Sequence, residues 1–332
     1  NNFHTTALCS PSRAAIAAGR NHHNIGMGSH SLTAMGFPGY NAHPPDTAKG
    51  YAEILKRAGY STMFLGKWDH TPQWESIFAG PFDRWPSGDG WEHFYGFMSG
   101  DMNNFNPIMW MDHTPMQPNY DAPGYHVNED LADTAIRWIS MLRASAHKKP
   151  FNMFWATGAV HAPHQAPREW IERFKGKFDM GYDEAREVIL ANQIEMGIVP
   201  PGTKLSPRDP EIPAWDTLND QEKALYARQM EAFAGQLAYS DYEFGRILDY
   251  LERIGELDNT LVLFTSDNGA SGEGGLHGTF NENGFFNGVS NMPNEFNNQY
   301  INEWGNRVGV WHVTAGWTMA GNTPFKYYKQ SA

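Results

Sequence analysis

The stretch EDLADTAIRWISMLRASAHKKPFNMFWAT, residues 129–157, decides the fold class. Its first half predicts a helix over 129–144, because apolar side chains recur there at helical spacing: Leu131, Ala135, Trp138, Ile139 and Leu142. The polar AHKKP break ends this helix, and the apolar run 151–157 that follows has the length of a strand. A helix that leads through a short turn into a buried strand is the building unit of α/β proteins.

Two further segments repeat this order. Residues 49–58 have helical spacing and stop at Gly59, after which 61–65 forms a short apolar run. Residues 220–254 are helical in pattern and lead into LVLFT at 261–265, a continuous run that predicts a strand buried on both faces.

Helices that alternate with buried strands predict a doubly wound, mostly parallel sheet flanked by helices. Such sheets bind ligands at the carboxyl ends of their strands, where the polar motifs of this chain fall: Gly66-Lys67, His161 and Asp267-Asn268. The segments 71–124 and 281–317 show no clear period and are expected to form long loops. Neither a repeat nor a linker interrupts the pattern, so one domain is expected over 1–332.

Composition excludes several classes of protein. A formal charge of −12 argues against a nucleic-acid partner, because a polyanion needs a basic face. Only 19% of the residues are charged and 14% are aromatic, which favours a globular enzyme over a disordered chain. Since no apolar run approaches the length of a membrane helix, no membrane span is expected. A single cysteine excludes an internal disulfide and leaves the compartment open among cytoplasm, periplasm and secretion.

That single cysteine lies in CSPSRAAIAAGR, residues 9–20. Pro11 suits the first turn of a helix, so Cys9 is expected at a helix N-terminus, which attracts anions. Arg13 follows one turn later, and Lys67 and Lys326 are further candidate cations. A lone cysteine is usually a small buried hydrophobe, and the residues around Cys9 are what favour a functional role.

Five motifs follow one another in a recognisable order: CSPSR with Gly19-Arg20, GYSTMFLGKW at 59–68, HAPH at 161–164, SDNG at 266–269 and GNTPFK at 321–326. In type and order they resemble the type I, formylglycine-dependent sulfatases of the alkaline phosphatase superfamily, especially the bacterial arylsulfatase branch. The resemblance covers nearly the whole chain.

The resemblance implies that Cys9 is oxidised to formylglycine by a formylglycine-generating enzyme and that Arg13 stabilises the product. It makes Lys67, His161 and Lys326 the contacts of a small-molecule sulfate ester, with His161 as a plausible general acid. Asp267 and Asn268 would bind Ca²⁺, with Mg²⁺ as the alternative. In that family one hydroxyl of the hydrated aldehyde attacks sulfur, and proton loss from the other then expels sulfate.

The chain departs from the family pattern at three places. After GKW the family has His, whereas this chain has Asp69 followed by His70, which is a further candidate substrate contact. The family takes two more metal-binding aspartates from a strand upstream of the cysteine and continues beyond GNTPFK into a C-terminal subdomain. We therefore expect the 332 residues to be a fragment without these parts.

Two alternatives stay open at this point. Relatives with the same nucleophile hydrolyse phosphonate monoesters or phosphodiesters, and the five motifs do not separate these from sulfatases. Asp69 and the missing aspartates also suit a catalytically impaired homologue. The aromatic segment around Trp85, Trp91, Trp110 and Met98 suits either an aryl-binding wall or simple packing, and packing is favoured.

Overall fold

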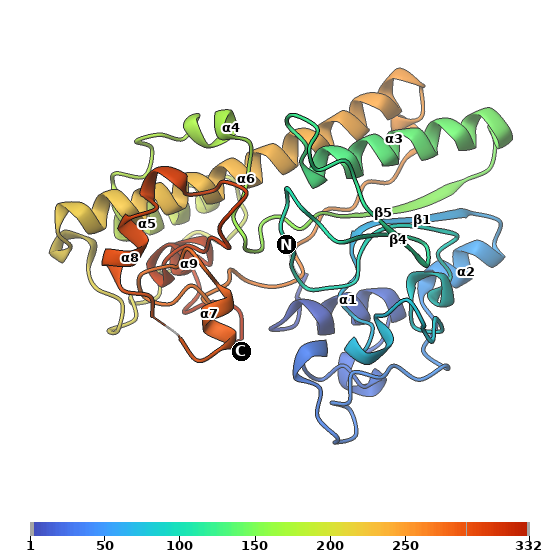
Figure 1. Cartoon of the computed structure of the whole chain (residues 1–332), viewed down its shortest axis with the longest axis horizontal. Helices are drawn as coiled ribbons and strands as arrows, with labels where there is room; N and C mark the ends of the chain where they lie inside the picture. The colour runs from blue at the N-terminus through green and yellow to red at the C-terminus, as the bar shows by residue number, and fades with distance from the viewer. Residues whose placement is uncertain (1–2, 290, 331–332) are drawn as a thin grey trace. The chain divides into compact units, whose positions relative to one another are not determined.

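The computed structural model describes residues 3–289 and 291–330 (Figure 1). Contacts group them into two compact units. The first contains Ala159–Tyr239 and the described part of Gly269–Ala332, and the second contains Thr5–Gly158 and Ser240–Asn268. The expected single domain stays a prediction. None of the described helices combines the length and the apolar character that a bilayer crossing needs.

Elements lie close to the ranges predicted at 49–58, 61–65, 129–144, 151–157 and 220–254, and further helices and strands occur outside them. The helices are α1 Cys9–Ala18, α2 Tyr51–Arg57, α3 Val127–Ala146, α4 Arg168–Glu172, α5 Gly181–Glu195, α6 Asp220–Arg253, α7 Asn283–Phe286, α8 Asn294–Asn298 and α9 Ala315–Gly321. The strands are β1 Ser61–Lys67, β2 His93–Phe97, β3 Met109–Met111, β4 Thr114–Met116 and β5 Phe151–Ala156. The two predicted helix-to-strand units α2–β1 and α3–β5 are confirmed.

The second unit is built on one mixed sheet with the strand order β4-β3-β2-β1-β5. Strand β1 lies between β2 and β5 and pairs in parallel with both, whereas β3 and β4 extend the sheet beyond β2 in antiparallel pairing. Parallel neighbours bring their carboxyl ends to one edge of the sheet, and Lys67 is the last residue of β1. The α/β expectation is confirmed, with parallel strands β2, β1 and β5 on one side of the sheet and the antiparallel strands β3 and β4 on the other.

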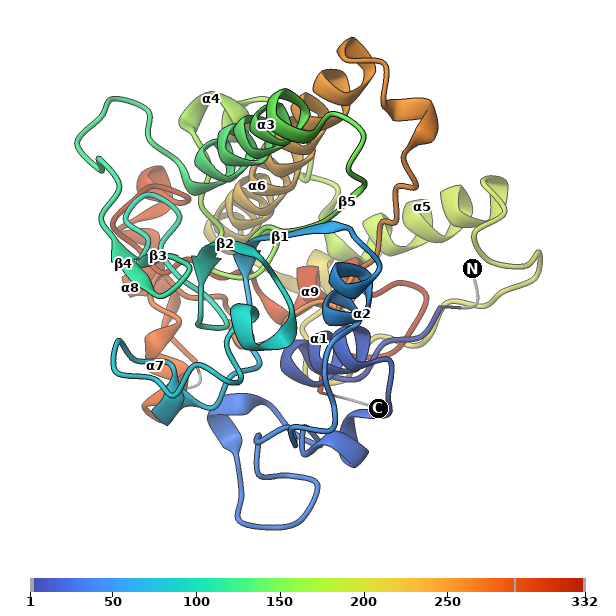
Figure 2. The same ribbon diagram turned by 90° about the vertical axis from the view of Figure 1, so that its right-hand side faces the viewer.

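Alternate residues of β1 build separate cores on the two faces of this sheet. Leu65 packs with Leu131 and Ile139 of α3, while its neighbour Phe64 faces the opposite way and packs with Ala52 of α2. Figure 2 shows α3 on one side of β1 and α2 on the other. Helices on both faces are what the doubly wound prediction requires.

The predicted strand at 261–265 is wrong for this structure. The segment is irregular, and Leu261, Leu263 and Phe264 are 83%, 82% and 88% exposed. An apolar run becomes a strand only where a neighbour offers its unpaired backbone groups, and none of the described strands pairs with it. The predicted loop 71–124 is also partly wrong, because it contains β2, β3 and β4.

The aromatic residues of that segment form core. Trp85 and Trp91 are buried and pack with Phe64 and Phe94, together with Met98 and the partly buried Trp110. The packing interpretation is therefore confirmed over the aryl-binding wall.

The first unit has its own core around α5, α9 and the beginning of α6. Trp215 and Trp317 pack against Tyr182 of α5 with ring centroids 5.2 and 6.0 Å away. The described parts of the predicted loop, 281–289 and 291–317, are largely irregular, as predicted, and contain the short helices α7 and α8 and the beginning of α9.

Candidate functional site

Cys9 is the first residue of α1 and is 2% exposed. Leu8 precedes it in an extended conformation and caps the helix without a side-chain bond. Thr6 instead fixes this entry, because its backbone N–H donates to the Ser12 hydroxyl at 3.0 Å. The sequence prediction that Cys9 lies at a helix N-terminus is confirmed, and it puts the side chain where the helix dipole favours negative charge.

Arg13, one turn further along α1, joins two distant segments of the second unit. Its Nε donates to Asp267 Oδ2 at 2.6 Å, and its Nη1 donates to the backbone oxygen of Lys67 at 2.7 Å. Burial alone raises the pKa of Asp267, but the Arg13 guanidinium outweighs burial and lowers it. Three predicted site residues, Arg13, Lys67 and Asp267, are thus brought together.

Lys67 and Asp69 form a buried ion pair at the end of β1. Lys67 Nζ lies 3.4 Å from Asp69 Oδ2, and the side chains are 3% and 1% exposed. Burial lowers the pKa of Lys67, yet Asp69 and Cys9 hold it above its usual value, so the ammonium stays charged. Burial likewise raises the pKa of Asp69, but Lys67 and His30 hold it well below its usual range.

His30 completes a cluster that the sequence did not predict. Its Nε2 lies 3.4 Å from Asp69 Oδ1, and Cys9, His30 and Asp69 bring one potential ligand atom each within 4.8 Å of one another. The following residue, Ser31, donates its backbone N–H to the Ser10 hydroxyl at 3.3 Å. This hydrogen bond links Ser10, which follows Cys9, to Ser31, which follows His30. Nothing in the local sequence around His30 signals this approach.

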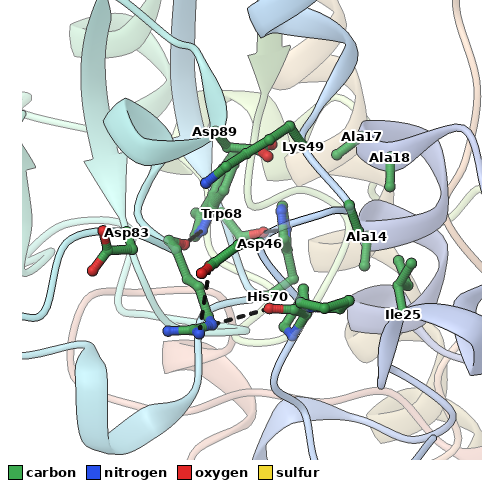
Figure 3. Close-up of a pocket in the computed structure, with 14 residues that line it drawn as sticks. Ala14, Ala17, Ala18, Ile25, Asp46, Lys49, Trp68, His70, Asp83 and Asp89 are labelled. Carbon is green, nitrogen blue, oxygen red and sulfur yellow. Dashed lines mark hydrogen bonds and ion pairs between the residues drawn. The ribbon is translucent and has the colours of Figure 1, made fainter.

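His70 takes a different direction from Asp69. Its Nδ1 bonds to the backbone oxygen of Trp68 at 2.9 Å, and its ring lies 3.8 Å from the Trp68 ring. Burial lowers the pKa of His70 to about 4, so the ring is neutral at physiological pH. Figure 3 shows it in a pocket with Trp68 and the α1 residue Ala14. Asp69, and not His70, is the residue that the structure places beside Cys9.

Asp267 and Asn268 are candidate ligands of a cation. They offer a carboxylate and an amide oxygen, and hard divalent cations prefer such ligands. The donor chemistry therefore fits the predicted group, while Asp267 Oδ2 is engaged by Arg13 in this structure.

His161 lies in the first unit, in a network with Lys329, a lysine that sequence reasoning did not name. Its Nδ1 donates to the backbone oxygen of Ala162 at 2.8 Å, which leaves Nε2 to accept from Lys329 Nζ at 3.2 Å. Lys329 is 5% exposed and pairs with Glu273 at 2.9 Å. Lys326, the predicted sulfate contact, is exposed, and no described contact joins its side chain to His161. The sequence did contain a signal for Lys329, because both lysines belong to the stretch GNTPFKYYK.

Comparisons with known proteins agree on one family. The sequence profile of the Sulfatase family matches residues 1–312. An uncharacterized sulfatase of Schizosaccharomyces pombe is 33% identical over 293 residues, which are 82% of this chain and 51% of that protein. The arylsulfatase of Klebsiella aerogenes is 27% identical over 339 residues, which are 99% of this chain and 69% of the enzyme. The chain thus spans about half the length of the first relative.

A solved structure supports the fold. Ps i-CgsB in complex with k-i-k-neocarrahexaose superposes with a TM-score of 0.53 at 22% identity, over 80% of this chain and 49% of that one. The family match covers both the cysteine motif that opens α1 and the segment with Asp267 and Asn268. The chain belongs to the sulfatase family.

Proposed function

We propose that this chain carries the catalytic residues of a formylglycine-dependent hydrolase that cleaves a sulfate monoester into an alcohol and sulfate. The observation that carries the proposal is the arrangement at α1, where the single cysteine opens a helix and lies in a cluster with Asp69 beside the charged Lys67. Similarity to the arylsulfatase of Klebsiella aerogenes supports an aryl or related sulfate ester as substrate.

In the proposed reaction Cys9 is first converted to formylglycine by a formylglycine-generating enzyme, and the aldehyde is hydrated. One hydroxyl loses its proton and its oxygen forms a bond to sulfur, while the bond from sulfur to the alcohol oxygen breaks and that oxygen takes up a proton. The second hydroxyl then loses its proton, the C=O bond re-forms, and the bond from carbon to the sulfated oxygen breaks. The covalent step thereby becomes two easier ones, and the aldehyde is regenerated.

Arg13 and Lys67 are proposed to stabilise the negative charge of the sulfuryl group. Both are fixed before substrate arrives, Arg13 by Asp267 and Lys67 by Asp69, so little reorganisation is needed in the transition state. A divalent cation, Ca²⁺ or alternatively Mg²⁺, would be held by Asp267 and Asn268 and would supply further positive charge to the sulfuryl oxygens.

His161 and Lys326 keep the sulfate-contacting roles that the motifs suggest, with His161 as the proposed proton donor to the alcohol oxygen. Lys329 joins them as a proposed site residue, because its buried ammonium donates to His161 Nε2 and thereby orients that ring.

Steady-state turnover of an aryl sulfate by the chain, co-expressed with a formylglycine-generating enzyme, tests the proposal. We expect sulfate release in protein whose residue 9 has been converted, as verified by peptide mass, and none in Cys9→Ala. Absence of turnover in the fully converted protein would contradict the proposed hydrolase.

The same preparation also tests the phosphonate alternative. Because kcat/KM measures differential binding of transition states, a matched pair of aryl sulfate and aryl phosphonate monoester ranks the two activities. We expect the sulfate to be preferred, and a higher kcat/KM for the phosphonate would reassign the substrate class.

A further inference from the structure

Among the described residues, none donates a hydrogen bond to Oδ2 of Asp69, a residue that lies in a cluster with the one that the proposed function converts. Oδ1 faces His30 Nε2 and Oδ2 faces Lys67 Nζ, each at 3.4 Å. At 3.4 Å both contacts are ion pairs. Oδ2 accepts no hydrogen bond from any of the described residues, although Asp69 is only 1% exposed. A buried acceptor without a donor costs free energy, so this oxygen favours any neighbour that offers an O–H group.

Asp69 acts only as an acceptor. Although burial alone raises its pKa, Lys67 and His30 hold that pKa well below its usual range, so the carboxylate is ionised at physiological pH. An ionised carboxylate has no hydrogen to donate.

His30 faces Asp69 with a ring nitrogen that carries a hydrogen. The backbone N–H of Leu32 donates to His30 Nδ1 at 3.2 Å, which assigns the ring proton to Nε2, the atom that faces Asp69. Burial lowers the pKa of His30, but Asp69 and Cys9 outweigh it and raise the pKa to about 10. The charged ring would have to give up the bond from Leu32, yet Nε2 carries a hydrogen in both forms.

Gly100 lies against the pair formed by His30 and Asp69. A Cβ at position 100 would stand 3.0 Å from Asp69 Oδ1 and 3.3 Å from His30 Nε2. Because position 100 has no side chain, His30 and Asp69 can pack against the backbone there. The hydrogen bond from Ser31 to Ser10 links the segment of His30 to the segment of Cys9.

The two forms of formylglycine differ in what they offer Asp69. An aldehyde oxygen is an acceptor, so it repels a carboxylate oxygen, whereas the hydrate brings two O–H donors. Building on the proposed conversion of Cys9, we propose that Asp69, positioned by His30, selects the hydrated form of residue 9 and orients one of its hydroxyls. Hydration adds the oxygen of water to the carbonyl carbon and moves one of its protons to the former carbonyl oxygen, so water is the only co-reactant.

The chain offers a direct measurement because it contains one cysteine. Labelling with [β-¹³C]cysteine gives a single carbon signal at residue 9, and its chemical shift separates thiol, aldehyde and hydrate. In converted wild-type protein we expect the hydrate signal to dominate. In Asp69→Asn, whose amide can donate to an aldehyde oxygen, we expect the hydrate-to-aldehyde ratio to fall about tenfold, which is about 1.4 kcal/mol. Asn also tolerates the positive φ of 63° at this position.

His30 variants test its positioning role. His30→Ala is expected to lower the ratio by a smaller factor, and His30→Gln is expected to restore it, because the Gln amide N–H can donate to Asp69 Oδ1. His23→Gln is the matched control, since His23 lies nearby in sequence and bonds to Tyr40 instead. Thermal unfolding of each variant shows whether it is folded.

The outcomes separate this inference from the proposed function. A dominant aldehyde in the wild type, or an unchanged ratio in Asp69→Asn, would overturn the selection of the hydrate. If the hydrate-to-aldehyde ratio responds as expected but the protein hydrolyses no sulfate ester, the selection of the hydrate would be supported and the proposed hydrolase activity contradicted. A signal from the thiol carbon alone would contradict the conversion of Cys9, and the selection with it.

Discussion

Lys326 and Lys329 are three positions apart, yet the structure gives them opposite environments. Lys329 is buried between His161 and Glu273, whereas Lys326 is exposed. Spacing along an irregular segment does not specify which side chain turns inward. The sequence therefore identified the motif, and burial distinguishes its two lysines.

Replacing each lysine by methionine tests this distinction. Lys329→Met should lower kcat/KM for an aryl sulfate about 100-fold, because it removes a charge beside His161 and leaves Glu273 without its partner. Lys326→Met should cost less, since its side chain lies in solvent. Steady-state kinetics on fully converted protein measure both, and a larger loss in Lys326→Met would reverse the assignment.

Asp69 and His70 show the same limit of sequence reasoning. The sequence located Asp69 at the position where the family has His and could not say which neighbour replaces the missing imidazole. The structure turns His70 toward Trp68 and brings His30 to Asp69 instead. That contact joins residues 39 positions apart, and only tertiary packing creates it.

At the scale of elements, β1 positions Lys67 through a glycine that the strand requires. Gly66 has a φ of +100°, and a Cβ there would stand 1.9 Å from the backbone oxygen of Ala156 in β5. Both the backbone conformation and the close approach of the strands exclude a side chain.

We expect Gly66→Ala to lower the free energy of unfolding by about 3 kcal/mol or more. Gly59→Ala is the matched control, because Gly59 has a φ of +91° but nothing within 4 Å of its Cβ position. It should cost about 1 kcal/mol, the strain of the backbone alone. Urea titrations measure both values, and equal losses would show that the contact with β5 adds nothing.

The segment 261–265 shows why an apolar run does not determine an element. LVLFT has the composition of a buried strand, but β5 pairs only with β1 among the described strands, and the segment stays irregular. Pairing depends on which strand edges are available, and that is a property of the whole sheet.

At the scale of the whole molecule, burial couples stability to pH through Asp89. Burial raises the pKa of Asp89 to about 7, although the backbone N–H of Gly50 donates to its Oδ1 and opposes the shift. The folded state therefore binds more protons than the unfolded state between about pH 4 and about pH 7. This contribution to stability is fully present below the unfolded pKa and is lost as pH rises through about 7.

Asp89→Asn should remove this loss of stability with rising pH, because Asn does not titrate. Its side-chain oxygen can still accept the hydrogen bond from the Gly50 backbone N–H. Between about pH 5 and about pH 8, the free energy of unfolding should fall by about 2 kcal/mol more in wild type than in the variant. Asp83→Asn, which changes an exposed carboxylate of the same pocket, should behave as wild type. Urea titrations at both pH values measure these free energies of unfolding. An equal change with pH in wild type and in Asp89→Asn would contradict the raised pKa of Asp89.

The sequence by itself determined the α/β class, the order of the helix-to-strand units and the motif at Cys9, because periodicity and capping act over a few neighbouring residues. It also determined the family, because five motifs keep their order along the chain. Only the tertiary structure decided that Asp69 and His30 lie beside Cys9, that Lys329 bonds to His161, and that 261–265 forms no strand. These features depend on contacts between segments far apart in sequence, which local patterns do not encode.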